Sequence, residues 1–114
     1  METKLRVLPR DFKGKLEPGD VYYDDYIKDW RVCLPIREPN RFLPFIEFAL
    51  NTCASSCTKH PDKPNPHRCW DISGDKELDN GDASKLTVHP SILIEYDPGK
   101  SIHGYITNGI WKEC

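Results

Sequence analysis

The sequence predicts a small, mostly β domain built from short antiparallel strands, with at most a minor helical part. Turn-forming residues are frequent, since ten prolines and seven glycines are spread over 114 residues, and such dense punctuation favours short strands over long helices. Apolar and polar residues alternate over several short segments, as in strands with one buried face. The length is near the common size of one domain, so residues 1–114 are expected to form a single domain.

The first half of the chain is expected to supply the outlying strands. Residues 1–29 are polar and charged, and they are predicted to form an N-terminal extension or a first strand. Residues 30–36 alternate between apolar and polar side chains, which predicts a strand. In residues 42–50, Pro44 interrupts any helix and the last apolar positions alternate like a strand.

The last third of the chain predicts a three-stranded antiparallel meander. Residues 86–96 are the longest β-rich run, and Pro90 within it predicts an edge strand or a bulge. Residues 102–107 and 110–112 follow, joined by Asn-Gly at positions 108–109. Asn-Gly is the strongest short hairpin signal and is typical of a type I′ turn.

Composition excludes two broad classes of function. The formal net charge is −2, from 16 basic and 18 acidic residues, whereas a strongly basic nucleic-acid binder needs a surplus of Lys and Arg. No apolar run approaches the roughly 18 residues of a membrane-spanning helix. The first residues are charged and contain no apolar core of a signal peptide, so a cytoplasmic location is expected.

The cysteines predict a structural zinc site. Five cysteines are an odd number, which argues against a framework made only of disulfides. Thiolate and imidazole are the ligands that Zn²⁺ selects, four at a time in structural sites. The predicted ligands are Cys53, Cys57, His60 and Cys69. His67 or Cys33 is an alternative to one of them, and free thiols or a disulfide are alternative interpretations of the cluster.

A serine, a histidine and an acid in the second half of the chain suggest nucleophilic catalysis. Ser91 is the candidate nucleophile, His103 the candidate general base, and Asp75 the acid that would orient the histidine. The alternative is ordinary structure, with Ser91 a strand residue, His103 part of the hairpin and Asp75 part of a turn.

Strand register decides whether Ser91 and His103 meet. A four-residue loop at 97–100 would put His103 on the opposite face of the sheet from Ser91. A three-residue loop would put them on one face but about 13 Å apart along the strands. A hydrogen bond between them therefore requires Pro90 to break the ladder, or a connection that is not a plain hairpin. His89 is the fallback base.

The second half of the chain resembles a small family of bacterial and phage proteins known as a domain of unknown function. The residues that carry the resemblance are Trp70, Gly74-Asp75, Thr87, Pro90-Ser91-Ile92, His103-Gly104 and Asn108-Gly109. The resemblance covers residues 45–112, and the upstream Cys/His cluster is similar too. Many relatives have a cysteine where this chain has Ile102. If that cysteine is a metal ligand in the relatives, this chain uses another ligand, for example Cys69, or binds no metal.

The resemblance implies a cytoplasmic bacterial enzyme. Some relatives are encoded in ubiquitination-like operons, beside E1-like, E2-like and ubiquitin-like proteins, in a setting of anti-phage defence. They are proposed to be serine-type peptidases that remove the ubiquitin-like protein. This carries the catalytic roles onto Ser91, His103 and Asp75, with backbone N–H groups or Thr87 as the oxyanion hole. The substrate would be the extended C-terminal tail of a ubiquitin-like protein, added to a sheet edge such as the strand containing Pro90.

Two other functions are carried as alternatives. One is a non-catalytic binding module, stapled by zinc, that holds a ubiquitin-like protein or an E1-like or E2-like partner. The other is a zinc-dependent peptidase with His89, His103 and Asp75 as the metal ligands.

Overall fold

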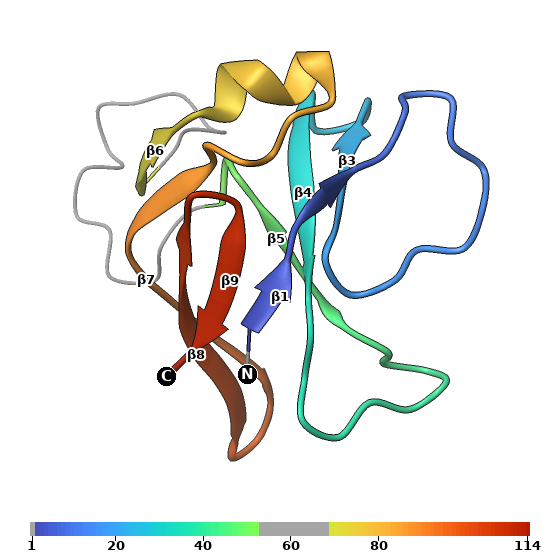
Figure 1. Ribbon diagram of the computed structural model, residues 1–114. Coiled ribbons are helices and arrows are strands. Elements are labelled where there is room, and N and C mark those ends of the chain that lie inside the picture. The colour runs from blue at the N-terminus through green and yellow to red at the C-terminus, as the bar shows by residue number, and fades with distance from the viewer. Residues whose placement is uncertain (1, 53–68) are drawn as a thin grey trace.

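A computed structural model describes residues 2–52 and 69–114 as two β-sheets packed on one core (Figure 1). The first sheet contains, in spatial order, β1 (Glu2–Lys4), β9 (Ile110–Glu113), β8 (Lys100–Thr107), β7 (Thr87–Asp97) and β6 (Asp71–Ser73). The second contains β2 (Arg6–Val7), β3 (Asp20–Asp24), β4 (Asp29–Leu34) and β5 (Ile46–Ala49). A mostly β fold with short antiparallel strands is therefore confirmed.

One apolar core joins the two sheets. Its members alternate with exposed residues along β8, as the sequence pattern predicts, whereas β4 is buried at nearly every position. The largest fully buried side chains are Trp111, Phe48, Leu34, Leu50, Leu78, Leu86, Ile92, Ile102 and Ile106. Leu78 comes from the only helix of the described residues, the short 3-10 helix η2 (Asp75–Asn80), which covers one end of the core. No helix in the described ranges is long and apolar enough to cross a membrane.

The N-terminal segment contributes to both sheets. β1 pairs with β9 in the first sheet, and β2 pairs in parallel with β3 in the second. Leu5 lies between β1 and β2 and is buried, which anchors the segment where it passes from one sheet to the other. An ion pair of 2.8 Å between Arg6 and the buried Asp20 adds to this anchor. The first 29 residues thus hold three strands, where the sequence predicted an extension or one strand.

The C-terminal meander forms as predicted. β7, β8 and β9 are consecutive antiparallel neighbours. The turn between β8 and β9 has positive φ at both central residues, 48° at Asn108 and 76° at Gly109, which is the type I′ geometry. Pro90 lies at a bulge of β7, one of the two predicted outcomes, and its peptide bond to His89 is cis.

Candidate active site

Two register shifts between β7 and β8 determine where Ser91 lies. At the hairpin end Asp97 is opposite Lys100, and after the first shift Leu93 is opposite His103. With this shift, the register differs from both registers that the three-residue and four-residue loops predicted. Ser91 stands two residues beyond Leu93, so it lies on the same face as His103 and diagonal to it. Diagonal neighbours of this kind lie about 7–8 Å apart, within reach of an aromatic side chain.

The second shift is the bulge that contains Ser91. Val88 is opposite Ile106 and Ile92 is opposite Gly104. Three residues of β7, at positions 89–91, therefore lie opposite a single residue of β8. The ladder to β8 is interrupted along this stretch, so Ser91 is positioned by other contacts than regular strand pairing.

Ser91 and His103 form a hydrogen bond. Ser91 Oγ lies 2.9 Å from His103 Nε2. When Nε2 carries no proton, the hydroxyl donates to it, which is the arrangement that a general base requires. His103 is exposed and Ser91 is half-buried, so a substrate can reach the pair from the outer face of the sheet.

His103 is fixed by regular strand pairing on both sides. Leu93 is its partner on β7, and the backbone N–H of Cys114 donates to the carbonyl oxygen of His103 at 2.9 Å. Beneath it, Gly104 leaves room for the ring of Trp111, where any side chain would collide. The backbone that carries the imidazole is thus held more regularly than the backbone that carries the serine.

Trp70 contacts Ser91 from the other side. Its indole Nε1–H donates to the carbonyl oxygen of Ser91 at 3.2 Å. The Trp70 ring packs edge-on against Phe48 of β5, with centroids 5.1 Å apart and an interplanar angle of 88°. Because Phe48 is buried in the common core, this contact connects the bulge to the second sheet.

Apolar side chains surround the Ser91–His103 pair. Leu93 is 64% exposed and Tyr105 is 45% exposed, and both belong to the outer face that carries His103. The Tyr105 and His103 rings lie 6.2 Å apart, tilted by 37°. The sequence reasoning missed this pair. Alternation puts position 93 on the face of Ser91 and position 105 on the face of His103, and the observed register brings these two faces together.

Asp75 is not brought to this pair. It follows β6, whose last residue Ser73 is opposite Thr87 at the start of β7. The register of β7 on β8 puts Thr87 beside Thr107, four residues from His103, or about 13 Å along the strand. The structure therefore unites two of the three predicted catalytic residues, and an orienting role for Asp75 stays a prediction that the register does not favour.

Thr87 has a structural role in place of the predicted catalytic one. Its Oγ1 accepts a hydrogen bond from the backbone N–H of Asn108 at 3.0 Å, at the start of the type I′ turn. The hydroxyl thus lies beside the turn between β8 and β9, away from Ser91. Thr87 does not fit the oxyanion-hole role that the resemblance implied.

The fallback base also lies apart. His89 is opposite Asp71 on β6 and its side chain makes no hydrogen bond to another described residue, while the Ser91 hydroxyl contacts His103. In the described part of the chain, no three His, Cys, Asp or Glu side chains are grouped closely enough to hold a metal. His89, His103 and Asp75, the ligands expected for a zinc-dependent peptidase, are therefore not grouped as a metal site.

Most of the predicted structural zinc site falls on residues that the structure does not describe. Cys53, Cys57 and His60 lie outside the described residues, as does His67, and only Cys69 is placed, half-buried, just before β6. The thiolate and imidazole donors suit Zn²⁺ by their chemistry.

Cys33, the alternative ligand, is a core residue of β4. It has no exposed surface. Burial, with smaller contributions from the charges of Glu47 and Asp20, raises the pKa of its thiol to about 12. Because the side chain of Cys33 is fully enclosed by the core, Cys33 is a packing residue.

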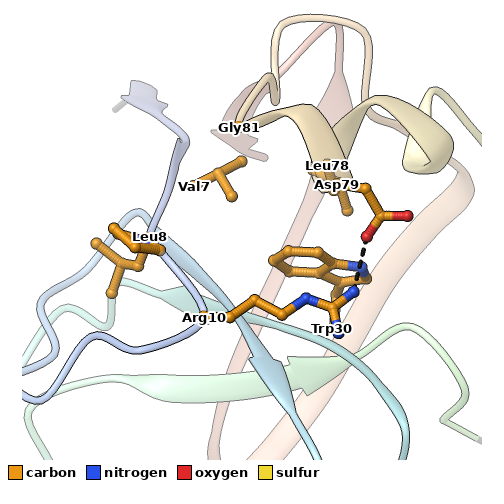
Figure 2. A pocket seen from close by; sticks show the side chains of 8 residues that line it. Val7, Leu8, Arg10, Trp30, Leu78, Asp79 and Gly81 are labelled. Carbon is orange, nitrogen blue, oxygen red and sulfur yellow. Dashed lines mark hydrogen bonds and ion pairs between the residues drawn. The ribbon is translucent and has the colours of Figure 1, made fainter.

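A pocket lies between the N-terminal segment and η2 (Figure 2). It is formed where the segment after β2 meets η2, and Trp30 is its floor. The Arg10 guanidinium stacks 3.8 Å above the centroid of the Tyr23 ring and pairs with Asp79 at 2.9 Å. Because Arg10 of the chain itself fills this aromatic site, the feature serves to fasten the N-terminal segment to η2.

Comparisons with protein-family models, with curated proteins and with solved structures found no match to this chain.

Proposed function

We propose that the protein is a serine-type peptidase or isopeptidase that removes or processes a ubiquitin-like protein. The observation that carries the proposal is the 2.9 Å contact between Ser91 Oγ and His103 Nε2 on an exposed sheet face. The sequence resemblance had assigned the nucleophile and the base to these same two residues, which lie 12 positions apart in the chain. The ubiquitin-like substrate is taken from that resemblance alone.

The reaction follows from the geometry of the pair. Ser91 Oγ attacks the carbonyl carbon of the scissile amide while His103 Nε2 takes the hydroxyl proton. The resulting imidazolium gives this proton to the leaving amine as the C–N bond breaks, and an acyl-serine remains. A water molecule then attacks the acyl carbon, His103 accepts a proton from it, and the acid product leaves as Ser91 regains its proton.

The imidazole of His103 is open to solvent. Among the described residues no carboxylate is hydrogen-bonded to His103, and its ring is exposed. Water can therefore stabilise the imidazolium that forms in the reaction, but it does not fix the ring orientation as an acid would. Loss of the orienting acid lowers the rate of a full triad about 10⁴-fold, so Ser91 and His103 acting without an acid would form a slow enzyme.

The surface around the pair suits an extended, partly apolar segment. Leu93 and Tyr105 offer apolar contact on either side of His103. β6 pairs with β7 only through residues 87–89, and no described strand continues along β7 beyond Ser91 on that side. An extended tail adding to β7 there would bring a carbonyl group close to Ser91.

A serine-directed fluorophosphonate probe tests the chemistry without requiring the substrate. We expect labelling at Ser91 in the wild type, none in Ser91→Ala, and a rate about 10²–10⁴-fold lower in His103→Gln, because the base is lost. Ser101→Ala is the matched control, since Ser101 is exposed on β8 two residues from His103. A chelator should leave the labelling of Ser91 unchanged.

The same variants are then tested for cleavage of a ubiquitin-like protein that carries a C-terminal extension. Loss of cleavage in both Ser91→Ala and His103→Gln, with wild-type cleavage surviving a chelator, is the expected result. Labelling of Ser101 equal to that of Ser91 would refute the proposal. Binding of the ubiquitin-like protein without any cleavage would favour the non-catalytic binding module instead.

The zinc assignment is a separate part of the proposal. A Zn²⁺ held by Cys53, Cys57, His60 and Cys69 would be structural, because four protein ligands leave no open position on the metal. It would fix the segment just before Trp70 and would take no part in the acyl transfer.

A further inference from the structure

The bulge leaves Ser91 without the regular ladder that holds its neighbours. Three residues of β7, including Ser91, lie opposite one residue of β8. On the other side, the last described pair between β6 and β7 joins Asp71 to His89. The described hydrogen bond to the Ser91 carbonyl oxygen comes from a side chain, the indole of Trp70.

We infer that Trp70 is a positioning residue for Ser91, whose indole N–H holds the Ser91 carbonyl and so sets the place of Ser91 Oγ against His103 Nε2. The inference rests on the proposed function. The donor atom is 3.2 Å from the carbonyl oxygen. One backbone carbonyl therefore connects the nucleophile to an aromatic side chain of the core.

The indole of Trp70 packs against the core on one side. Trp70 is half-buried and meets Phe48 edge-on, with centroids 5.1 Å apart. Phe48 is only 1% exposed, so it cannot move without disturbing the core. Phe48 thus packs against the Trp70 ring, while the restraint on Ser91 itself is the hydrogen bond from the indole N–H to its carbonyl.

The two partners of the reaction are fixed in different ways as a result. His103 is held by backbone pairing to Leu93 and Cys114. Ser91 is held by the Trp70 indole at a break in the ladder. Removing the indole N–H should loosen the serine without moving the histidine.

Trp70→Phe tests this, because phenylalanine keeps an aromatic ring against Phe48 but has no N–H donor. We expect the maximal rate of fluorophosphonate labelling at Ser91 to fall about three- to tenfold, the effect of one neutral hydrogen bond. The probe concentration that gives half the maximal rate should stay unchanged. Trp70→Leu, which also has no side-chain donor, should give the same loss and serves if the phenylalanine variant does not fold.

Phe48→Leu is the matched control. It removes the ring contact and lowers the melting temperature, but it leaves the indole N–H in place. We expect its maximal labelling rate at Ser91 to stay within twofold of the wild type at a temperature where both are folded. An equal slowing in Phe48→Leu and Trp70→Phe would show that only packing matters and would overturn the inference.

A readout that needs no activity separates this inference from the proposed function. The ¹⁵N chemical shift of His103 Nε2, at a pH where the imidazole is neutral, reports whether Ser91 donates to it. In Trp70→Phe we expect this shift to move toward that of Ser91→Ala, and in Phe48→Leu to match the wild type. A response of this kind in a protein whose Ser91 is never labelled would keep the positioning role and refute the peptidase. A Trp70→Phe variant identical to the wild type in both shift and labelling would refute the inference alone.

Discussion

Replacing Gly104 with alanine should destabilise the protein although its backbone needs no positive φ. A Cβ at this position would lie 2.5 Å from the carbonyl oxygen of Lys112 and 2.7 Å from the ring of Trp111. Real Cβ atoms essentially never come closer than 3.0 Å to such atoms. One obstacle is backbone in the β8–β9 ladder and the other is a fully buried ring, so neither can move aside easily.

The expected loss follows from two opposing effects. Overpacking costs about 1–3 kcal/mol, and a backbone obstacle puts Gly104→Ala near the upper end. Alanine recovers about 0.5–1 kcal/mol because it restricts the unfolded chain more than glycine does. The net loss in free energy of unfolding is about 2 kcal/mol, which lowers the melting temperature by about 8 °C in a domain of this size.

Gly99→Ala is the matched control for this prediction. Gly99 has a φ of 74°, and a Cβ added there would have no atom within 4 Å. Its replacement by alanine therefore costs only the left-handed backbone strain, about 1–2 kcal/mol. The restriction of the unfolded chain offsets part of this cost, as it does at Gly104. Urea unfolding and calorimetry of both variants measure the difference. A Gly104→Ala protein as stable as the wild type, or more stable than Gly99→Ala, would refute the collision argument.

Three further predictions concern other parts of the molecule. Because burial raises the pKa of Cys33 from 9.0 to about 12, only the unfolded state ionises above pH 9. Its stabilising contribution is therefore complete below pH 9 and falls by up to about 1.4 kcal/mol per pH unit above it; Cys33→Ala should show a shallower alkaline loss in urea titrations, and an equal slope would contradict this. Arg10→Ala should lower the free energy of unfolding by about 1 kcal/mol, because its guanidinium stacks on Tyr23. Asp79→Asn should lower it by less than about 0.5 kcal/mol, because both members of the ion pair are more than half exposed. Equal losses in chemical denaturation would contradict this ranking. Purified wild type should contain about one zinc per chain by elemental analysis, and Cys57→Ser should lose both the metal and much of the thermal stability; a zinc-free wild type with an equally stable variant would refute the structural zinc site.

Local patterns in the sequence predicted most of the strands, because alternation and turn residues can be recognised within a few neighbouring positions. The alternation at 30–36 and 42–50 became β4 and β5. Asn108-Gly109 became the type I′ turn because both central positions must tolerate positive φ. β1 and β2 were missed, since both are very short and have little alternation to read, and their pairing depends on distant strands. η2 has one buried side chain, Leu78, which is too little for a helical period.

The site was harder to predict because it depends on register, which is not a local property. Ser91 and His103 could be named as a candidate pair, but simple loops placed them on opposite faces or far apart. The register shift between Glu95 and Asp97 has no proline or glycine at its position, so the sequence contains no signal that predicts it. Pro90 did announce the second shift. The sequence contained no signal that the Trp70 indole meets the carbonyl of Ser91, because side-chain bonds across 21 residues follow only from the folded sheet.

The two register shifts also explain how an antiparallel sheet brings Ser91 and His103 into contact. In an uninterrupted ladder each side chain has fixed neighbours, and Ser91 would have had the position that its loop dictates. The shift at the hairpin brings Ser91 to the face of His103, and the bulge breaks the ladder just at the serine. The nucleophile thereby gains a position that neither strand alone specifies, and it needs a separate restraint to keep it. That need is why a perturbation at Trp70, which touches neither the histidine nor the hydroxyl, should alter the serine more than the histidine.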